Sequence, residues 1–248
     1  MAATIDDSYG SPPRRPNAVT RKLEALAPLG PDDRLMLDEW ERSAVMVGAG
    51  QPLAAEGAVP DSISWLFEGW AAWHKDFRDG RRQILALLLP GDSWEGDPEA
   101  RVPLDHGVRT LTRARIAKIP REVVTEVLRG HPRLATALRR ADLVEQSFLR
   151  AWMVNLGQRP ALERMAHLIC EVGHRLGQGA DVTGDRRFEL PLTQLELASA
   201  LGLTSVHVNR VLQRLRSGGL IDFRDGIMVI HDHARLCALA DFKAGPLA

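Results

Sequence analysis

The segment from Thr204 to Ser217 carries the kinds of polar side chain that bind nucleic acid, with three arginines and no acidic residue. Read as a helix, it turns Val208, Val211 and Leu215 inward. Guanidinium groups bind phosphate oxygens and the O6/N7 edge of guanine, and amide side chains match adenine. The outward face therefore predicts contact with DNA, and its polar members are Ser205, His207, Asn209, Arg210, Gln213, Arg214 and Arg216.

Local signals predict where this helix and the one before it begin. Thr193 and Glu196 have the spacing of a capping box, in which each side chain accepts a hydrogen bond from the other residue's backbone N–H. Gly202 suits the left-handed residue that ends a helix, and Thr204 can cap the next one. The segment thus predicts two helices joined by a short turn. Thr193, Gln194 and Thr204 join the candidate DNA contacts.

A predicted β-hairpin follows the second helix. The run LIDFRDGIMVI, residues 220–230, reads as two short strands joined by Asp225 and Gly226, which suit a tight turn. Arg224 beside this turn would reach a DNA phosphate. Paired helices with an arginine face also occur in proteins that never bind DNA, so the helix pair alone is a modest indication. A wing placed directly after it favours DNA.

The whole-chain composition gives no further indication of a nucleic-acid partner. Among 248 residues, Lys plus Arg and Asp plus Glu number 32 each, so the net charge is zero and any DNA affinity must come from local charge. The longest apolar run, Ile84–Leu89, is too short to span a membrane. The first twenty residues lack the apolar core of a signal peptide. Cys170 and Cys237 lie too far apart to indicate a disulfide framework or an iron–sulfur cluster. We therefore expect a soluble cytoplasmic protein with no membrane partner and no cofactor.

Short strand-like runs fill residues 41–120. Glycines at positions 69, 80 and 91 fall at the spacing of an antiparallel barrel or sandwich, and Asp79–Gly80 is a strong hairpin signal. A short helical lead-in, about Arg21–Trp40, precedes these runs, and residues 1–20 read as a disordered arm.

One long helix is predicted from Pro132 to Gln158, with apolar residues at steps of three and four. Such a helix is about 40 Å long, more than one small barrel needs. We expect the apolar stripe to form a homodimer contact through Leu134, Leu138, Ala141, Val144, Phe148 and Trp152. The alternative is that the stripe packs on its own barrel.

The order of barrel, long helix and winged helix-turn-helix resembles the Crp/Fnr family of bacterial transcription regulators over about residues 21–240. The most specific stretches are LFEGWAAWHKDFRDGRRQILALLLPGD and ELPLTQLELASALGLTSVHVNRVLQRLRSGGLI. The resemblance implies an α+β fold with an N-terminal β-roll (jelly-roll) like a cyclic-nucleotide-binding domain at residues 21–125. A dimerisation helix at 126–158 and a winged helix-turn-helix at 159–248 would follow. It also implies a homodimer that binds a palindromic DNA site and works with RNA polymerase.

The family's base-contacting positions fall on Ser205, Val206, Asn209 and Arg210. Arg210 matches the family's usual arginine. Val206 departs from it, because many members have Glu there to accept a hydrogen bond from cytosine, so the half-site sequence cannot be carried over.

The effector side departs further from the family. Members that bind cyclic nucleotides have a Gly-Glu-Leu run after the Gly-Asp turn and an Arg-Ser pair for the phosphate. Here Gly91 and Asp92 are followed by SWEGDPEARVPLDHG, whose acids Glu95, Asp97, Glu99 and Asp105 would repel a phosphate. Cyclic AMP is therefore not expected. Residues 1–40 contain no Cys, which excludes the family's N-terminal iron–sulfur cluster.

Two hypotheses concern the sensor pocket itself. His74 or His106 offers an axial nitrogen for haem, although a single His in a strand or loop is more often solvated or hydrogen-bonded. Alternatively, an apolar effector pocket is lined by aromatic and basic residues of the barrel, although such aromatics more often fill a core. The candidates for this second pocket are Trp70, Trp73, His74, Leu87, Trp94 and Arg101.

Rival functions find less support in the residues. A cupin-like metalloenzyme needs clustered histidines in its barrel, whereas the only His-x-His, His231 to His233, follows the wing. No catalytic triad, paired-carboxylate or phosphate-loop motif is present in a usable context, so we do not expect an enzyme. An effector-binding module that docks on a protein instead of DNA remains the alternative.

Overall fold

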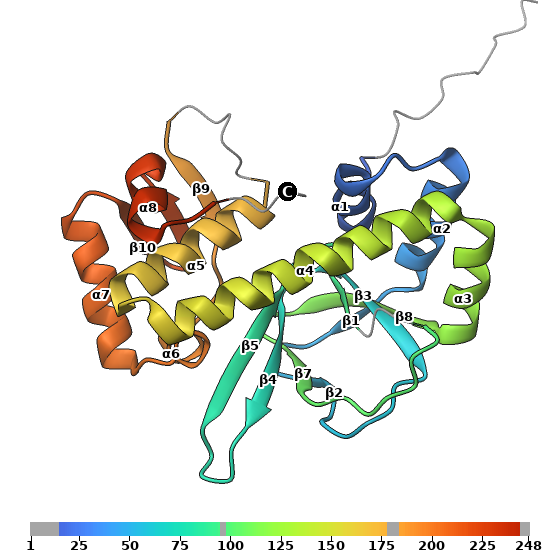
Figure 1. Ribbon diagram of the computed structural model, residues 1–248, viewed down its shortest axis with the longest axis horizontal. Coiled ribbons are helices and arrows are strands. Elements are labelled where there is room, and N and C mark those ends of the chain that lie inside the picture. Colours follow the sequence, from blue (N-terminus) through green and yellow to red (C-terminus); the bar gives the residue numbers. More distant parts are fainter. Residues whose placement is uncertain (1–14, 95–97, 178–183, 244–248) are drawn as a thin grey trace, which may run out of the picture.

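The computed structural model describes residues 15–94, 98–177 and 184–243. Its N-terminal part is a β-roll flanked by helices, its C-terminal part is a smaller α/β unit, and one long helix runs between them (Figure 1). No helix within these residues is both long enough and apolar enough to cross a bilayer.

Two helices open the chain and pack on the β-roll. Helix α1 (Ala18–Leu26) begins after Asn17, whose side chain accepts a hydrogen bond from the Thr20 N–H. Helix α2 (Pro31–Ser43) begins after Gly30. Of the predicted arm, residues 1–20, the first fourteen lie outside the described residues. Residues 18–20 of the predicted arm already belong to α1. The predicted arm is therefore too long, because Asn17 caps the helix and α1 begins at Ala18.

The β-roll consists of two four-stranded antiparallel sheets, and it confirms the predicted all-β region. One sheet has the order β1 (Val45–Val47), β8 (Ala114–Pro120), β3 (Ser62–Glu68) and β6 (Ser93–Trp94). The other has the order β2 (Pro52–Ala54), β7 (Gly107–Thr110), β4 (Ala71–Asp76) and β5 (Arg82–Leu88). Strands β4 and β5 form the predicted hairpin, and Gly80 takes the positive φ of +83° that its turn needs. Leu66, Trp94 and Ile116 fill the space between the sheets.

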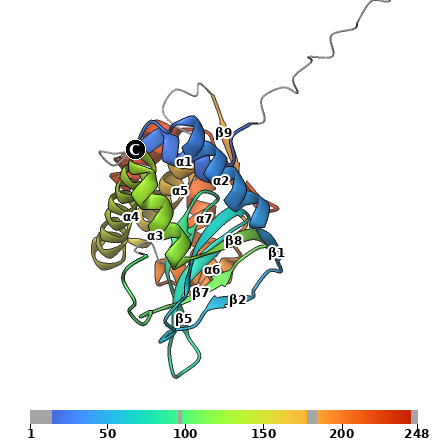
Figure 2. The same cartoon turned by 90° about the vertical axis from the view of Figure 1, so that its right-hand side faces the viewer.

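Two helices follow the β-roll where the sequence predicted a dimerisation segment at 126–158. Helix α3 (Arg121–Gly130) ends before His131, and helix α4 (Pro132–Gln158) begins at the proline, as the apolar spacing predicted. In the side view of Figure 2, α3 and α4 lie along one side of the strands. The residues 126–130 therefore belong to a separate helix, because Pro132 cannot continue the hydrogen bonding of α3.

The predicted dimer stripe of α4 faces its own chain. Leu134 and Ala141 are buried in a cluster with residues of α1, α2 and β3, and Leu138 packs against that cluster. Trp152 is buried in a second cluster. These residues do not form the exposed subunit contact that we expected. A stripe facing the core and a stripe facing a partner have the same periodicity, so only the packing distinguishes them.

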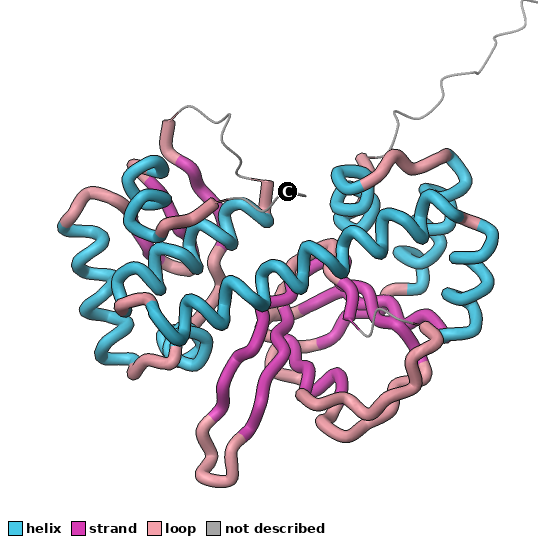
Figure 3. The backbone as a smooth tube through the Cα atoms, in the orientation of Figure 1, coloured by secondary structure: helices cyan, strands magenta, loops and turns pink. Residues whose placement is uncertain are grey.

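The C-terminal unit contains the predicted winged helix-turn-helix (Figure 3). Helix α5 (Ala161–Arg175) is followed by β9 (Arg186–Glu189), α6 (Gln194–Leu201) and α7 (Ser205–Ser217). Strands β10 (Ile221–Arg224) and β11 (Ile227–Ile230) then form the wing, and α8 (His233–Ala240) closes the unit. The three strands form one antiparallel sheet in the order β10-β11-β9.

The β-roll and the C-terminal unit share one apolar cluster. Ile84 and Leu87 of β5 pack with Met165 of α5 and Leu197 of α6. Hydrogen bonds reinforce the contact: the Ser199 hydroxyl donates to the Arg82 carbonyl oxygen at 2.7 Å and accepts from the Ile84 N–H at 3.2 Å. The first helix of the helix-turn-helix is thus attached directly to a strand of the β-roll.

Candidate nucleic-acid interface and effector cavity

The ends of α6 and α7 form as their local signals predicted. The Thr193 hydroxyl accepts from the Glu196 N–H at 3.2 Å, and the Glu196 carboxylate accepts from the Thr193 N–H at 2.7 Å. Gly202 ends α6 in the left-handed region with φ of +61°. Thr204 caps α7 by accepting from the His207 N–H at 3.2 Å. These bonds fix the relative start positions of both helices.

Helix α7 buries its apolar face and leaves the opposite face to solvent. Val208, Val211 and Leu215 are at most 2% exposed. The exposed outer face comprises Val206, His207, Asn209, Arg210, Gln213 and Arg214, with Ser205 half-buried at its start. Thr193, Gln194 and Thr204 are also exposed at the starts of the two helices. The structure therefore brings the predicted contact residues of both helices to the surface.

Arg210 and Arg214 are available to an outside partner. No carboxylate of residues 15–94, 98–177 or 184–243 is paired with either guanidinium. Arg216 was also predicted on this face, and that prediction is wrong. It is half-buried, and its guanidinium donates to the Phe223 carbonyl oxygen of β10, so it holds the wing against α7. Arg216 lies in the last turn of α7, where β10 packs beside the helix, and the sequence did not reveal this contact.

The wing presents Arg224 at its tip. Strands β10 and β11 pair from Ile221 with Ile230 to Arg224 with Ile227. Asp225 and Gly226 between them both have positive φ, +50° and +74°. Arg224 is exposed, and its guanidinium makes no hydrogen bond or ion pair within the described part of the chain. It can therefore contact a phosphate without losing another partner.

Leu195 is a surface feature that sequence reasoning missed. It is 72% exposed on the first turn of α6, next to Gln194. Leu195 lies between the two capping-box residues Thr193 and Glu196, and no signal in the sequence showed that its side chain is exposed.

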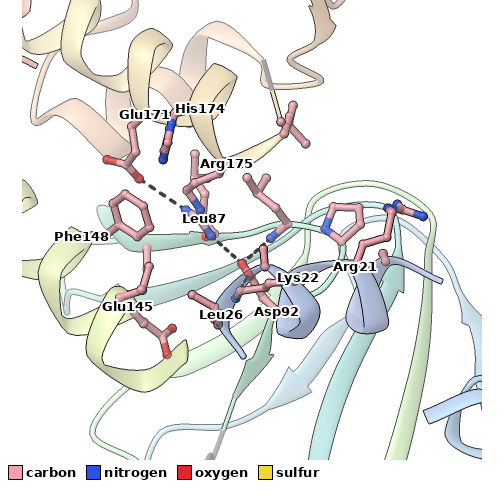
Figure 4. Close-up of a pocket in the computed structure, with 18 of the residues that line it drawn as sticks. Arg21, Lys22, Leu26, Leu87, Asp92, Glu145, Phe148, Glu171, His174 and Arg175 are labelled. Atoms are coloured by element: carbon pink, nitrogen blue, oxygen red, sulfur yellow. Dashed lines mark hydrogen bonds and ion pairs between the residues drawn. The ribbon is translucent and has the colours of Figure 1, made fainter. Parts of the chain in front are cut away.

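A cavity of about 550 Å³ lies between α1, β5, α4 and α5 (Figure 4). Its apolar wall includes Leu26, Leu87, Phe148 and Trp152, and its polar wall includes charged residues from all four elements or the loops beside them. Val144 and Phe148, predicted for the dimer stripe, are half-buried and line this cavity. The volume suits a small organic molecule.

A buried network of ion pairs forms one side of the cavity. Asp92 lies 2.5 Å from Lys22 Nζ and 2.5 Å from Arg175 Nη2, and it also accepts from the Leu89 N–H at 2.7 Å. Arg175 Nη1 lies 3.4 Å from Glu171, which accepts from the Trp152 indole N–H at 2.8 Å. Burial acts to raise the pKa of Asp92, but the charges of Lys22 and Arg175 outweigh it and hold that pKa below its ordinary value.

Glu145 makes no hydrogen bond or ion pair in the described part of the chain. Burial raises the pKa of Glu145 to about 7, and the charge of Asp92 acts in the same direction. The charges of Lys22 and Arg175 act to lower this pKa. The cavity thus contains a carboxyl group that titrates near neutral pH beside a carboxylate that stays ionised.

The structure does not bring the six predicted effector residues together. Leu87 alone lines the large cavity. Trp70 lines a separate, more open hollow with Glu189. Trp94 is fully buried between the sheets. The sequence places these residues on neighbouring strands, but alternate positions of a strand face opposite sides of a sheet.

The remaining members of that set have partners of their own. The Trp73 ring lies 4.6 Å from the His106 ring, and His106 Nδ1 lies 2.7 Å from Asp105. His74 is half-buried, and burial lowers its pKa. Arg101 is exposed and paired with Glu122. Neither histidine lines the large cavity, and Glu95 and Asp97 of the predicted acidic loop lie outside the described residues.

Two known domain families match this chain, one in its N-terminal part and one in its C-terminal part. Residues 44–131 match the model of the cyclic nucleotide-binding domain, and residues 163–239 match that of the Crp-like helix-turn-helix domain.

Two curated relatives are similar over most of their length. The transcriptional activatory protein AadR of Rhodopseudomonas palustris is 31% identical over 227 residues, which are 90% of this chain and 92% of that protein. The transcriptional activator protein FnrL of Cereibacter sphaeroides is 31% identical over 191 residues, 76% of each chain. Among solved structures, FixK2 of Bradyrhizobium japonicum matches with a TM-score of 0.69 and 24% identity, covering 81% of this chain and 99% of that one.

Proposed function

Because the chain belongs to the Crp/Fnr family of transcription regulators, we propose that it binds a palindromic DNA site as a homodimer and places α7 in the major groove of each half-site. The single observation that carries this assignment is the outer face of α7, which holds unpaired Arg210 and Arg214 beside exposed amide side chains. Half-sites bound in this way lie about 34 to 36 Å apart, one turn of DNA.

In this proposal, some residues contact the DNA bases and others contact the DNA backbone. Arg210 bonds a guanine edge, and Asn209 and Gln213 read adenine or its neighbours. Ser205, Val206 and His207 lie at the start of α7, where a recognition helix meets base edges and the adjoining backbone. Thr193, Gln194, Thr204, Arg214 and Arg224 bind phosphates and fix the register.

The subunit contact uses the outward face of α4. Leu143, Met153 and Val154 are 53%, 74% and 50% exposed, and they share a face with Gln146 and Arg150 at steps of three and four. Exposed apolar side chains repeated along a long helix are typical of a two-helix contact. This face replaces the buried stripe as the dimer surface.

The cavity beside Asp92 is the candidate effector site, in place of the pocket inside the β-roll. It borders elements of both domains, so a bound molecule would change the contact between sensor and DNA-binding domain. Its acidic residues Asp92, Glu145 and Glu171 are matched in number by Arg21, Lys22 and Arg175, so the charge of the cavity does not select an anionic ligand such as a cyclic nucleotide. Since curated relatives are named activators, RNA polymerase is the further partner.

Selection of bound DNA from a random pool tests the assignment, with protein purified without additives. We expect an inverted repeat and an affinity that falls steeply with salt concentration, because phosphate contacts release counterions. Binding without sequence preference, together with a flat salt response, would instead support docking on a protein. The control is Arg129→Ala, which removes an exposed arginine of α3 outside the proposed DNA contacts. Its affinity for the selected site is compared with that of the parent protein.

A further inference from the structure

Tertiary folding brings the chain's two cysteines together. Cys170 is buried on α5 and Cys237 is half-buried on α8, and their Sγ atoms lie 3.6 Å apart. Helices α5 and α8 pack against one another in the C-terminal domain (Figure 1). Neither cysteine lies on the exposed face of α7, so the proposed DNA contacts do not account for the pair.

We propose that Cys170 and Cys237 are a reversible oxidation site, at which a hydroperoxide forms an intramolecular disulfide that joins α5 to α8. A disulfide bond is about 2.05 Å long, so the sulfur atoms must approach by about 1.5 Å. Cys237 is only half-buried, so its side chain is less confined than that of Cys170.

His233 lies beside Cys237, one helical turn earlier on α8. Its Nε2 atom is 3.3 Å from Cys237 Sγ. Burial lowers the pKa of His233, and the charges of Arg186 on β9 and His174 on α5 lower it further. The imidazole is therefore neutral near pH 7 and can accept the Cys237 proton.

Cys170 is suited to the second step. Burial raises the pKa of the Cys170 thiol, and the neighbouring Cys237 raises it further. Cys170 therefore stays protonated and shielded, while the more exposed sulfur of Cys237 meets the oxidant first.

The chemistry balances in two steps. The Cys237 thiolate attacks one peroxide oxygen, the O–O bond breaks, and the leaving oxygen takes the proton held by His233 and departs as water or an alcohol. Cys237 is now a sulfenic acid. The Cys170 sulfur attacks the Cys237 sulfur, the S–O bond breaks, and the hydroxyl leaves as water with the Cys170 proton. The two thiols lose two electrons, and the peroxide gains them.

The test uses the full chain, reduced and then treated with hydrogen peroxide. We expect both titratable thiols to disappear, the intact mass to fall by two hydrogen atoms, and one cross-linked peptide pair to contain Cys170 and Cys237. The product should run as a single chain on a non-reducing gel, and dithiothreitol should restore both thiols. No DNA is present, so the result is independent of the proposed function.

Single variants distinguish the steps. In Cys170→Ala, the sulfenic acid of Cys237 should accumulate and be trapped by dimedone, whereas in Cys237→Ala the buried Cys170 should stay reduced. His233→Ala should oxidise about tenfold more slowly near pH 7, with the difference closing at alkaline pH, where thiols ionise unaided. Two intact thiols after treatment of the parent, a disulfide between two chains, or equal sulfenic acid in the parent and Cys170→Ala would each overturn the proposal.

Discussion

The carboxylate of Asp92 in the β-roll lies 2.5 Å from the guanidinium of Arg175, on the first helix of the DNA-binding domain. Both side chains are largely buried, and Asp92 also pairs with Lys22 of α1. One carboxylate therefore connects three elements at the junction of the two domains, next to the candidate effector cavity.

Arg175→Met should lower the free energy of unfolding by about 3 kcal/mol, because it leaves Asp92 and Glu171 buried without their shared cation. Urea unfolding followed by circular dichroism measures this change. Arg129→Met is the control, since the Arg129–Glu99 pair is exposed and its loss should cost no more than about 1 kcal/mol. If the double variant Asp92→Asn, Arg175→Met is destabilised by the full sum of the single effects, the two side chains are not coupled.

Glu145→Gln should stabilise the protein at pH 8 and have little effect at pH 5. The pKa of Glu145 is about 7 in the folded chain, above the ordinary value of about 4.3 in the unfolded chain. The folded state thus binds more protons between these values, and the free energy of unfolding falls as pH rises through that window and stays lower above it. Thermal melts at both pH values, with the exposed Glu126→Gln as control, check the sign. An equal shift at both pH values would contradict it.

Arg210→Ala should cost about 1 to 3 kcal/mol of affinity for the selected DNA site and relax the preference at one base pair of each half-site. The reason is the loss of a bidentate bond to a guanine edge. Fluorescence anisotropy with the site and its single-base variants measures both effects. Unchanged preference at every base pair would show that Arg210 does not read sequence.

Arg224→Ala should weaken binding to the selected site and to unrelated DNA by the same factor. It removes one phosphate contact, so the slope of log K against log salt should become less negative by about 1. Titrations at several salt concentrations give this slope. A loss confined to the selected site would reassign Arg224 to base reading.

Replacing both Leu143 and Met153 by Glu should convert the dimer to monomers, because it places acids in an apolar contact between two α4 helices. Sedimentation velocity measures the mass in solution. The matched control is Leu35→Glu, because Leu35 of α2 is an exposed leucine outside the proposed contact, with 57% of its surface exposed. This variant should remain dimeric. A double variant that stays dimeric would place the subunit contact elsewhere.

Local signals in the sequence were sufficient for most elements and for the exposed polar face of α7. The capping box at Thr193 and Glu196, Gly202 and the Asp225–Gly226 turn each act over a few residues, so their effect can be read without the rest of the chain. The apolar spacing from residue 132 likewise predicted the start of α4, although not the separate helix α3 before it.

What the tertiary structure decided is which surfaces meet. Leu134 and Trp152 have the spacing of a dimer stripe, yet they are buried in their own chain, because a helix's periodicity does not say what covers it. Asp92 meets Arg175, and Cys170 meets Cys237, only because elements far apart in the sequence pack side by side. The sequence by itself determined the local elements and the chemistry available on the α7 face. Packing between domains determined the cavity and the buried ion pairs, and packing of α5 on α8 within the C-terminal domain determined the cysteine pair. All of these depend on distances that no local pattern encodes.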